Sequence, residues 1–391
     1  MKKFFVMYNS RIKFLKVFNN QGGARTLNWE FAYWWNTIER WYDEGLPRLS
    51  PINLKNLNYS QCVCGEALIY PGSILSKDVH IFFGFDEEMK SVPLDTQIIP
   101  RFRKKILRDE GNNIVLRNND GKILKTRKDG TSMPLFLKYP VENKEDFKKL
   151  KKRYDTDFKK RLPKNWDKLK KDYKKRSYPL QLGMAPDGFF AVLRELMGFE
   201  KACMVFYDDP KFVIEIFDFY TTYWIELYLK VLEDTDIDYF HIFEDMAYRN
   251  GSFISPDIFK KFISPYLKKL IFSLRKKGIK NFGVDSDGNI NELIPLWLET
   301  GINSIYPFEV GAGMDIETTR KQYPNLVIMG GINKNELSKD KYAINKELKK
   351  ISRMLKKGKY IPFTDHMVNP DTSFENYKYY RENLKKIIDS V

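Results

Sequence analysis

Short apolar segments alternate with longer amphipathic segments throughout the C-terminal half of the chain, and this order restricts the fold most. We expect strands at 180–185, 238–243, 279–284, 302–307, 326–329 and 360–363. Helical patterns lie between them, at 210–232, 255–277, 291–300 and 345–355. Because parallel strands need long crossover connections, the alternation predicts a parallel sheet covered by helices.

The number of these units favours a closed barrel over an open sheet. Six strand–helix units leave room upstream for two more, so we expect an α/β fold of the (β/α)₈ TIM type. A doubly wound sheet is the alternative, but it usually begins with a glycine-rich phosphate turn, and the sequence has none. The 391 residues could form two domains, yet barrels with insertions reach this length, so we expect one barrel domain over 1–391.

A different pattern precedes the barrel-like half. Within 98–139, Asp120-Gly121 separates two alternating apolar runs, which is a strong hairpin signal. The segment 144–176 follows, rich in lysine but interrupted by acidic and apolar residues at helical intervals. We therefore expect an insertion over 98–176 that contains an antiparallel hairpin and Lys-rich helices, beside the barrel mouth.

Composition limits the partners and the compartment. The formal charge of +16 could indicate nucleic acid, but it is concentrated in the Lys-rich stretch, whose pattern is that of a solvated face, and no nucleic-acid motif is present. No apolar run approaches the ~18 residues of a membrane span, and no signal peptide is apparent. Three cysteines, two of them the isolated pair Cys62 and Cys64, argue against a disulfide framework, so we expect a cytoplasmic protein.

Four expected strands are each followed by an acid or a histidine. The residues at these strand ends are Glu244, Asp245, Asp285, Asp287, Glu309, Asp365 and His366. Any one of them alone is as often a helix cap as a functional group. In a barrel, however, the carboxyl ends of the strands form the site, so the coincidence on four strands predicts a cluster.

A cluster of carboxylates can be stabilised in only a few ways. Carboxylates that converge in a partly dry mouth must raise their pKa values, bind a cation or bind a cationic substrate. Asp285, Asp287 and His366 offer oxygen and imidazole ligands suited to a divalent metal. Without a metal, the same three groups could transfer protons.

Other histidines and arginines are weaker candidates. His241 lies inside an apolar strand and His80 precedes an apolar run, so both are expected to be structural. Arginines near the start, such as Arg25, could bind a carboxylated substrate through bidentate bonds. Arg194 opens the helix behind a barrel strand and is better placed for that role.

These residues lie in motifs that resemble the uroporphyrinogen decarboxylase superfamily, which includes corrinoid-linked methyltransferases. The matching motifs are AP at 185–186, FED at 243–245, VDSDG at 284–288, PFEV at 307–310, GGINK at 330–334 and IPFTDH at 361–366. The resemblance implies a TIM-type barrel, often as a homodimer. It also implies catalytic roles for His366 and for Asp86, which lies in FFGFD near an early strand end.

The sequence departs from both branches of that family. The Arg-rich motif with which the decarboxylases hold substrate carboxylates is missing, and no tyrosine lies at 192–194. The methyltransferases bind zinc through a His-x-Cys pair and a later Cys, and those positions resemble Asp285, Asp287 and His366. This set contains harder ligands, so the metal position is expected to survive with altered ligands or to have become an acid–base cluster.

The sequence therefore predicts an enzyme that acts on a small carboxylated organic substrate other than uroporphyrinogen. In this reading Glu244, Asp245, His366 and Asp86 act in catalysis, and Arg25, Arg194 and Glu309 bind substrate. One alternative is methyl transfer to or from a corrinoid protein or a thiol. Another is a non-catalytic barrel that only binds a ligand.

Overall fold

The main sheet of the protein is parallel and curled. A computed structural model describes residues 9–19, 25–50, 68–69, 76–128 and 134–390. Seven strands pair in the order β3-β8-β9-β12-β13-β14-β15, every neighbouring pair being parallel. They are β3 (Lys90–Ser91), β8 (Leu180–Leu182), β9 (Tyr239–Phe243), β12 (Phe282–Asp285), β13 (Ser304–Phe308), β14 (Val327–Gly330) and β15 (Tyr360–Ile361). Each of the six strands predicted from the sequence overlaps one of them.

An N-terminal segment lies between the two edges of this curled sheet. The amide of Asp86, which precedes β3, donates to the carbonyl of Asn28 at 3.1 Å. The amide of Val368, which follows β15, donates to the carbonyl of Ala32 at 3.0 Å. The next residues form β1 (Tyr33–Trp34), which pairs with β2 (Leu68–Ile69). The α/β arrangement is therefore consistent with a TIM-type barrel.

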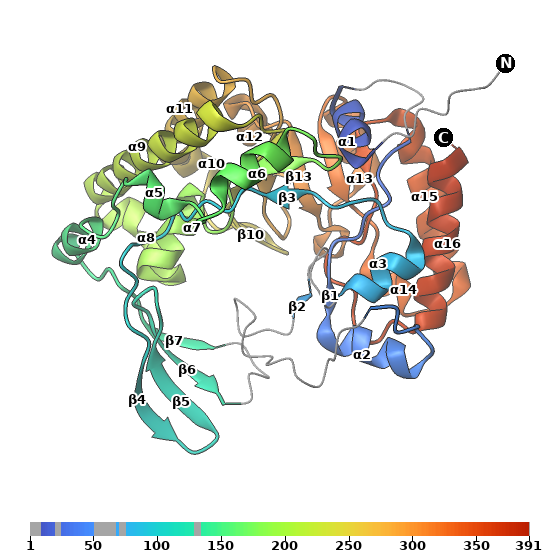
Figure 1. Ribbon diagram of the computed structural model, residues 1–391, viewed down its shortest axis with the longest axis horizontal. Coiled ribbons are helices and arrows are strands. Elements are labelled where there is room, and N and C mark those ends of the chain that lie inside the picture. Colours follow the sequence, from blue (N-terminus) through green and yellow to red (C-terminus); the bar gives the residue numbers. More distant parts are fainter. Residues whose placement is uncertain (1–8, 20–24, 51–67, 70–75, 129–133, 391) are drawn as a thin grey trace.

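Helices cover the outside of the sheet. In Figure 1, α9 and α11 lie along one side of the molecule, and α15 and α16 lie against each other on the other side. The bounds of these four are Pro210–Asp234, Ser264–Arg275, Lys341–Lys357 and Phe374–Ser390. The others in the barrel half are α7 (Phe189–Met197), α8 (Phe199–Asp208), α10 (Pro256–Ile258), α12 (Ile294–Thr300), α13 (Ile316–Gln322) and α14 (Lys334–Leu337), with a π-helical turn at Phe259–Ile263 and a short hairpin, β10 (Ala247–Tyr248) and β11 (Gly251–Ser252).

Helix α1 (Ser10–Asn19) fills the barrel at the amino ends of the strands. Phe14 is fully buried and its ring meets the inward-facing ring of Tyr239 edge-on, with 5.7 Å between centroids. Arg11 binds Asp238, the residue before β9, and Lys359, the residue before β15, donates to the carbonyl of Phe18. This end of the barrel is therefore closed by aromatic packing, and the opposite end carries the polar residues.

The inserted segment forms a second, antiparallel sheet that projects from the body in Figure 1. Its strands are β4 (Lys105–Glu110), β5 (Asn113–Arg117), β6 (Ile123–Arg127) and β7 (Leu135–Lys138). It holds two strands more than the predicted hairpin, because β4 and β7 are exposed along their whole lengths and bury no face that an apolar pattern would mark. The helices that follow are α4 (Lys144–Lys151), α5 (Phe158–Arg161) and α6 (Trp166–Tyr173), and α2 (Trp35–Asp43) and α3 (Lys77–Phe83) lie earlier in the chain.

Within the ranges that the structure describes, each helix is either too short or too polar to cross a bilayer. Cys62 and Cys64 lie outside the described residues.

Candidate functional site

Three aspartates converge where β9 and β12 end. One carboxylate oxygen from each of Asp245, Asp285 and Asp287 lies within 4.8 Å of the others. The backbone brings them together, because the amides of Glu244 and Asp245 both donate to the carbonyl of Asp285, at 2.8 and 3.3 Å. The carboxyl ends of two neighbouring parallel strands thus deliver all three groups to one place.

The backbone of Asp245 is unusual. Its φ of +46° lies in the left-handed region, which residues other than glycine rarely occupy, although aspartate tolerates it better than most. Arg194 in α7 supports this conformation, with one guanidinium nitrogen 2.7 Å from the carbonyl oxygen of Asp245 and the other 3.4 Å from its carboxylate. Non-glycine residues held in this region cluster at functional sites, so the geometry marks Asp245 as a position of interest.

Two histidines complete the cluster. His366 Nε2 lies 3.2 Å from Asp287 Oδ2, and His241 Nε2 lies 3.4 Å from Asp285 Oδ2. The ring of His366 also packs against Phe31, with 5.2 Å between centroids. The sequence indicated a structural role for His241, but Tyr239 and His241 share the inward face of β9. The alternation along that strand was therefore the signal that could have found it.

The protonation of these groups follows from crowding. Burial, together with the charges of Asp287 and Asp285, raises the pKa of Asp245 to about 7. Burial also raises the pKa of Asp285, in spite of the hydrogen bond from His241. Burial alone would lower the pKa of His366, but its hydrogen bond to Asp287 raises it overall. Near neutral pH the cluster therefore holds protons that separate carboxylates would have lost.

Glu244 faces away from the three aspartates. It is fully buried, and its oxygens accept from the amides of Phe189 and Phe190 at the start of α7, at 3.0 and 2.8 Å. Gly188 makes this approach feasible, since a Cβ there would lie 1.8 Å from the carbonyl oxygen of Phe243. Burial raises the pKa of Glu244 to about 7, although these amide donors lower it. Its contacts are those of a helix cap.

Glu309 and Asp365 support loops at the same rim. Glu309 accepts from the amide of Gly288 at 2.8 Å, next to Asp287. Asp365 is fully buried and accepts from the amides of Lys334 and Gly311, at 3.0 and 2.8 Å. Burial raises the pKa of Asp365 to about 6. Glu309 thus lies at the edge of the cluster, as a second layer behind the aspartates.

Asp86 and Arg25 lie elsewhere. Asp86 is bound by Lys13 at 2.6 Å and by the amide of Asn28 at 2.8 Å, beside the N-terminal segment. Arg25 pairs with Asp389 near the end of α16, and its side chain is 56% exposed. Because α16 runs back from the carboxyl end of β15, Arg25 lies at the amino end of the barrel. Of the predicted residues, the structure therefore groups Asp245, Asp285, Asp287, His366 and Arg194, with Glu309 adjacent.

Comparison with known proteins identifies the family of this chain. The profile of the family Uroporphyrinogen decarboxylase (URO-D) matches residues 124–387. Among solved structures, a methyltransferase from Methanosarcina mazei is similar over 98% of this chain and 99% of its own, with 16% sequence identity and a TM-score of 0.56. None of the curated proteins matches the chain. The family match spans most of the sequence, including every strand-end motif described above, and the chain belongs to the uroporphyrinogen decarboxylase superfamily.

Proposed function

We propose that this protein is a methyltransferase that moves a methyl group between a corrinoid and a small nucleophile such as a thiol. The observation that carries the proposal is the convergence of Asp245, Asp285 and Asp287 within 4.8 Å, with His366 hydrogen-bonded to Asp287. The similarity over the whole length of a methyltransferase supports this choice. In the methyltransferase branch, the positions that resemble Asp285, Asp287 and His366 hold a metal.

The donor set suits a divalent cation. Three carboxylate oxygens and one imidazole nitrogen are ligands for zinc or a harder divalent metal, whereas thiolate ligands would select softer ions. A cation would also relieve the repulsion that raises the pKa of Asp245 and Asp285. When bound, it would lower the pKa of a coordinated thiol or hydroxyl and so supply the nucleophile.

The protein side chains have distinct tasks in this proposal. Arg194 holds Asp245 in its left-handed conformation, and His241 orients Asp285. The proton released by the nucleophile leaves through the open side of the cluster, where 39% of the Asp287 side chain is exposed. The new bond from the nucleophile to the methyl carbon forms as the bond from that carbon to the donor breaks.

Decarboxylation is the second candidate, favoured by the family match and by an aspartate with a pKa of about 7. Loss of CO₂ would leave an electron pair on the substrate carbon, and the protonated Asp245 could supply the replacing proton. The negative charges of the aspartates make decarboxylation the less favoured candidate. Among the described residues, Arg194 is the one arginine or lysine bonded to the aspartates, so a carboxylated substrate would meet net repulsion.

The decisive experiment measures metal content and methyl transfer together. Purified wild-type protein and the variant Asp287→Asn are analysed for bound metals, and both are incubated with methylcobalamin and a thiol while demethylation is followed by absorbance. We expect near-stoichiometric metal in the wild type and a loss of affinity and rate of about 100-fold in the variant. Asp315→Asn is the control, because this aspartate caps α13 and should leave both quantities unchanged.

Two outcomes would contradict the proposal. One is wild-type protein that binds no metal and leaves methylcobalamin intact. The other is an Asp287→Asn variant that retains both metal and activity. Release of CO₂ from a carboxylated substrate by wild-type protein but not by Asp245→Asn would instead favour decarboxylation.

A further inference from the structure

The projecting sheet formed by β4 to β7 has two chemically different faces. Residues that pair across antiparallel strands lie on the same face, so the register assigns each side chain to one face or the other. Lys105, Arg117 and Lys138 thus share one row across the sheet. We call this side the basic face, and its charged residues in the described strands are Lys105, Arg108, Arg117, Lys125, Arg127 and Lys138, with one acid, Glu110.

The opposite face is apolar. One row across it consists of Ile106, Leu116, Leu124 and Phe136. Leu116 and Leu124 are buried, with 4% and 8% exposure. Among the strand residues that the structure describes, no lysine or arginine pairs on this side. The positive charges of the sheet are therefore segregated on one face.

The sheet and its base concentrate the charge of the chain. Residues 101–128 and 134–138 contain eleven lysines and arginines and three aspartates and glutamates, so their net charge is +8. That is half of the formal charge of +16 carried by all 391 residues. A strong field of one sign on a projecting element attracts partners of the opposite sign.

The charges of the basic face are not balanced within the chain. Lys105 and Arg117 lie directly opposite each other on neighbouring strands, and like charges in this arrangement destabilise a sheet. Within the described residues, neither forms an ion pair. The acid of this face, Glu110, is shared between Arg108 and Lys125, at 2.9 and 2.8 Å. An anionic partner would remove this repulsion.

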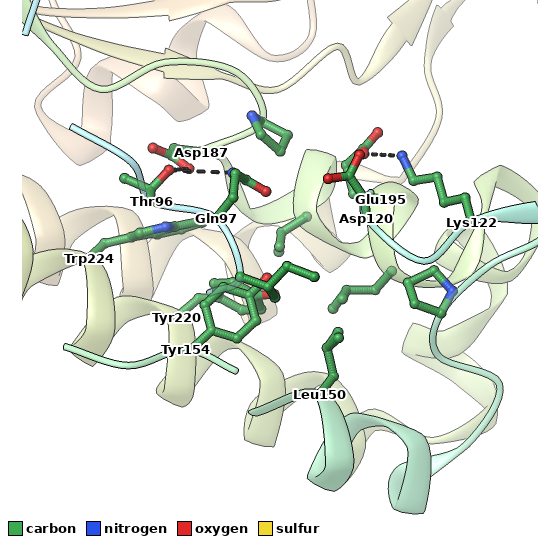
Figure 2. A pocket seen from close by; sticks show the side chains of 15 residues that line it. Thr96, Gln97, Asp120, Lys122, Leu150, Tyr154, Asp187, Glu195, Tyr220 and Trp224 are labelled. Carbon is green, nitrogen blue, oxygen red and sulfur yellow. Dashed lines mark hydrogen bonds and ion pairs between the residues drawn. The ribbon is translucent and has the colours of Figure 1, made fainter. Parts of the chain in front are cut away.

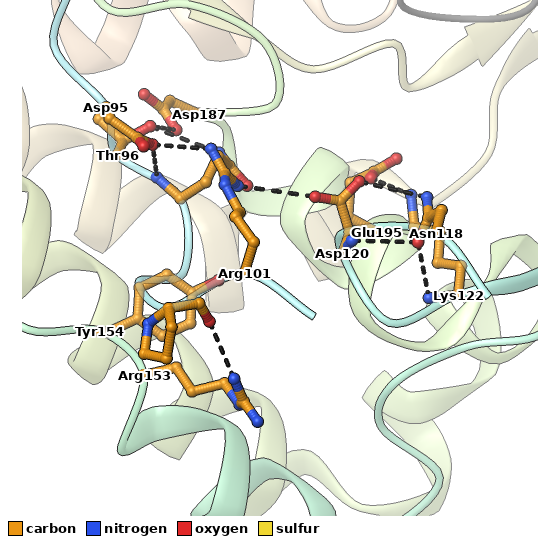
Figure 3. A network of polar contacts seen from close by, with 12 residues as sticks. Asp95, Thr96, Arg101, Asn118, Asp120, Lys122, Arg153, Tyr154, Asp187 and Glu195 are labelled. Atoms are coloured by element: carbon orange, nitrogen blue, oxygen red, sulfur yellow. Dashed lines mark hydrogen bonds and ion pairs between the residues drawn. The ribbon is translucent and has the colours of Figure 1, made fainter. Parts of the chain in front are cut away.

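Contacts at its base hold the sheet at the carboxyl ends of the barrel strands. Arg101 pairs with Asp120, in the turn between β5 and β6, at 3.6 Å, and Lys122 binds Glu195 in α7 (Figure 3). Figure 2 shows the narrow cavity at this junction, with Asp120 and Lys122 on one side and Asp187 on the other. Because Asp187 follows the carboxyl end of β8, the sheet projects from the end of the barrel opposite α1, as Figure 1 shows.

We propose that the basic face is a docking surface for an acidic protein, which it holds beside the mouth of the barrel. A protein is favoured over a nucleic acid because the described side chains on this face include no aromatic ring on which bases could stack. Apolar side chains lie between the charges instead, among them Ile123 and Leu135, which is 61% exposed. Such a mixture of apolar contacts and charges is typical of protein interfaces.

The test uses full-length protein and two labelled probes, poly-L-glutamate as a model acidic chain and a DNA duplex of equal total charge. Binding is followed by fluorescence anisotropy at physiological ionic strength. The variant Lys105→Glu/Lys138→Glu reverses two exposed charges at opposite edges of the basic face. We expect it to bind poly-L-glutamate at least about tenfold more weakly than the wild type.

A matched control separates the basic face from the net charge of the chain. Lys168→Glu/Lys171→Glu makes the same change in net charge at two exposed positions of α6, and it should bind poly-L-glutamate as the wild type does. Lys105→Gln/Lys138→Gln removes the charges of the basic face without adding repulsion to the sheet. It should also weaken binding, by a smaller factor, even where the glutamate variant folds poorly.

Four outcomes overturn the proposal. They are wild-type protein that does not bind poly-L-glutamate, unchanged binding by both variants of the basic face, an equal loss in the α6 control, and tighter binding of the DNA duplex that is lost in Lys105→Glu/Lys138→Glu. The last outcome would assign the face to a nucleic acid. Metal content and methyl transfer are not part of this readout, so its failure would leave the proposed function standing.

Discussion

Two acidic sites inside this barrel differ in how far their charges are neutralised. Glu30, fully buried, accepts from the hydroxyls of Thr364 and Tyr377 and pairs with Arg381, whose side chain is 1% exposed. The three aspartates at the ends of β9 and β12 are bonded to Arg194 alone among the described arginines and lysines, and 28% of the Asp245 side chain is exposed.

The difference indicates a structural role for Glu30 and a ligand-binding role for the three aspartates. Both carboxylate oxygens of Glu30 accept hydrogen bonds and both terminal nitrogens of Arg381 donate them, and the pair joins the N-terminal segment to α16. The aspartates keep lone pairs unused and repel one another. A chain with 67 lysines and arginines could have neutralised them, so the open group is the one suited to a ligand.

The largest effect on stability is expected from removing the charge of Glu30. Glu30→Gln leaves Arg381 buried without its counter-charge, and we expect the free energy of unfolding to fall by about 3–5 kcal/mol. Urea denaturation followed by circular dichroism measures this change. Glu375→Gln removes an acid that is 77% exposed and should leave the stability unchanged. A loss below ~1 kcal/mol in Glu30→Gln would erase the contrast between the two groups.

The three clustered aspartates should affect the pH dependence of stability. The folded-state pKa of Asp245, about 7, exceeds its unfolded value, so the folded protein retains a proton that the unfolded chain releases. The contribution of Asp245 to the stability of the metal-free protein should therefore be lost as pH rises from about 4 to 7, and the raised pKa values of Asp285 and His366 act in the same direction.

Asp245→Asn removes one source of this fall, and asparagine also tolerates the left-handed backbone. Melting temperatures recorded from pH 4 to 8 should decrease less steeply in the variant than in the wild type. A saturating divalent cation should flatten the wild-type curve in the same way. Parallel curves for the two proteins would show that Asp245 does not retain a proton in the folded state.

The smallest effect is expected at Arg25, whose pair with Asp389 lies at the far end of the barrel. Both side chains are exposed, by 56% and 43%, so Arg25→Ala should change stability by less than ~0.5 kcal/mol and leave metal binding and methyl transfer intact. Thermal denaturation and the methylcobalamin assay check this. A loss of activity in Arg25→Ala would mean that the site extends beyond the carboxyl ends of the strands.

Much of this site could be predicted from strand ends alone, because a parallel sheet places them together. That rule located Asp285, Asp287 and His366, but it could not separate Glu244 from Asp245. Glu244 and Asp245 are neighbours in the chain, and which of them faces the barrel mouth depends on the local backbone conformation. It also depends on how closely α7 can approach the strand, which Gly188 permits. The contacts of Asp86 and Arg25 come from the N-terminal segment and α16, whose positions are set by packing across hundreds of residues.

The aromatic closure by α1 has a kinetic consequence. Phe14 and Tyr239 close the amino end, so within the described residues the aspartates are approached from the carboxyl ends of the strands, where reactants would enter and products would leave. In the proposed methyl transfer, a bulky corrinoid-carrying partner would present its reactive group at the rim, after the smaller reactant had bound beneath it. Turnover would accordingly follow a fixed order of arrival.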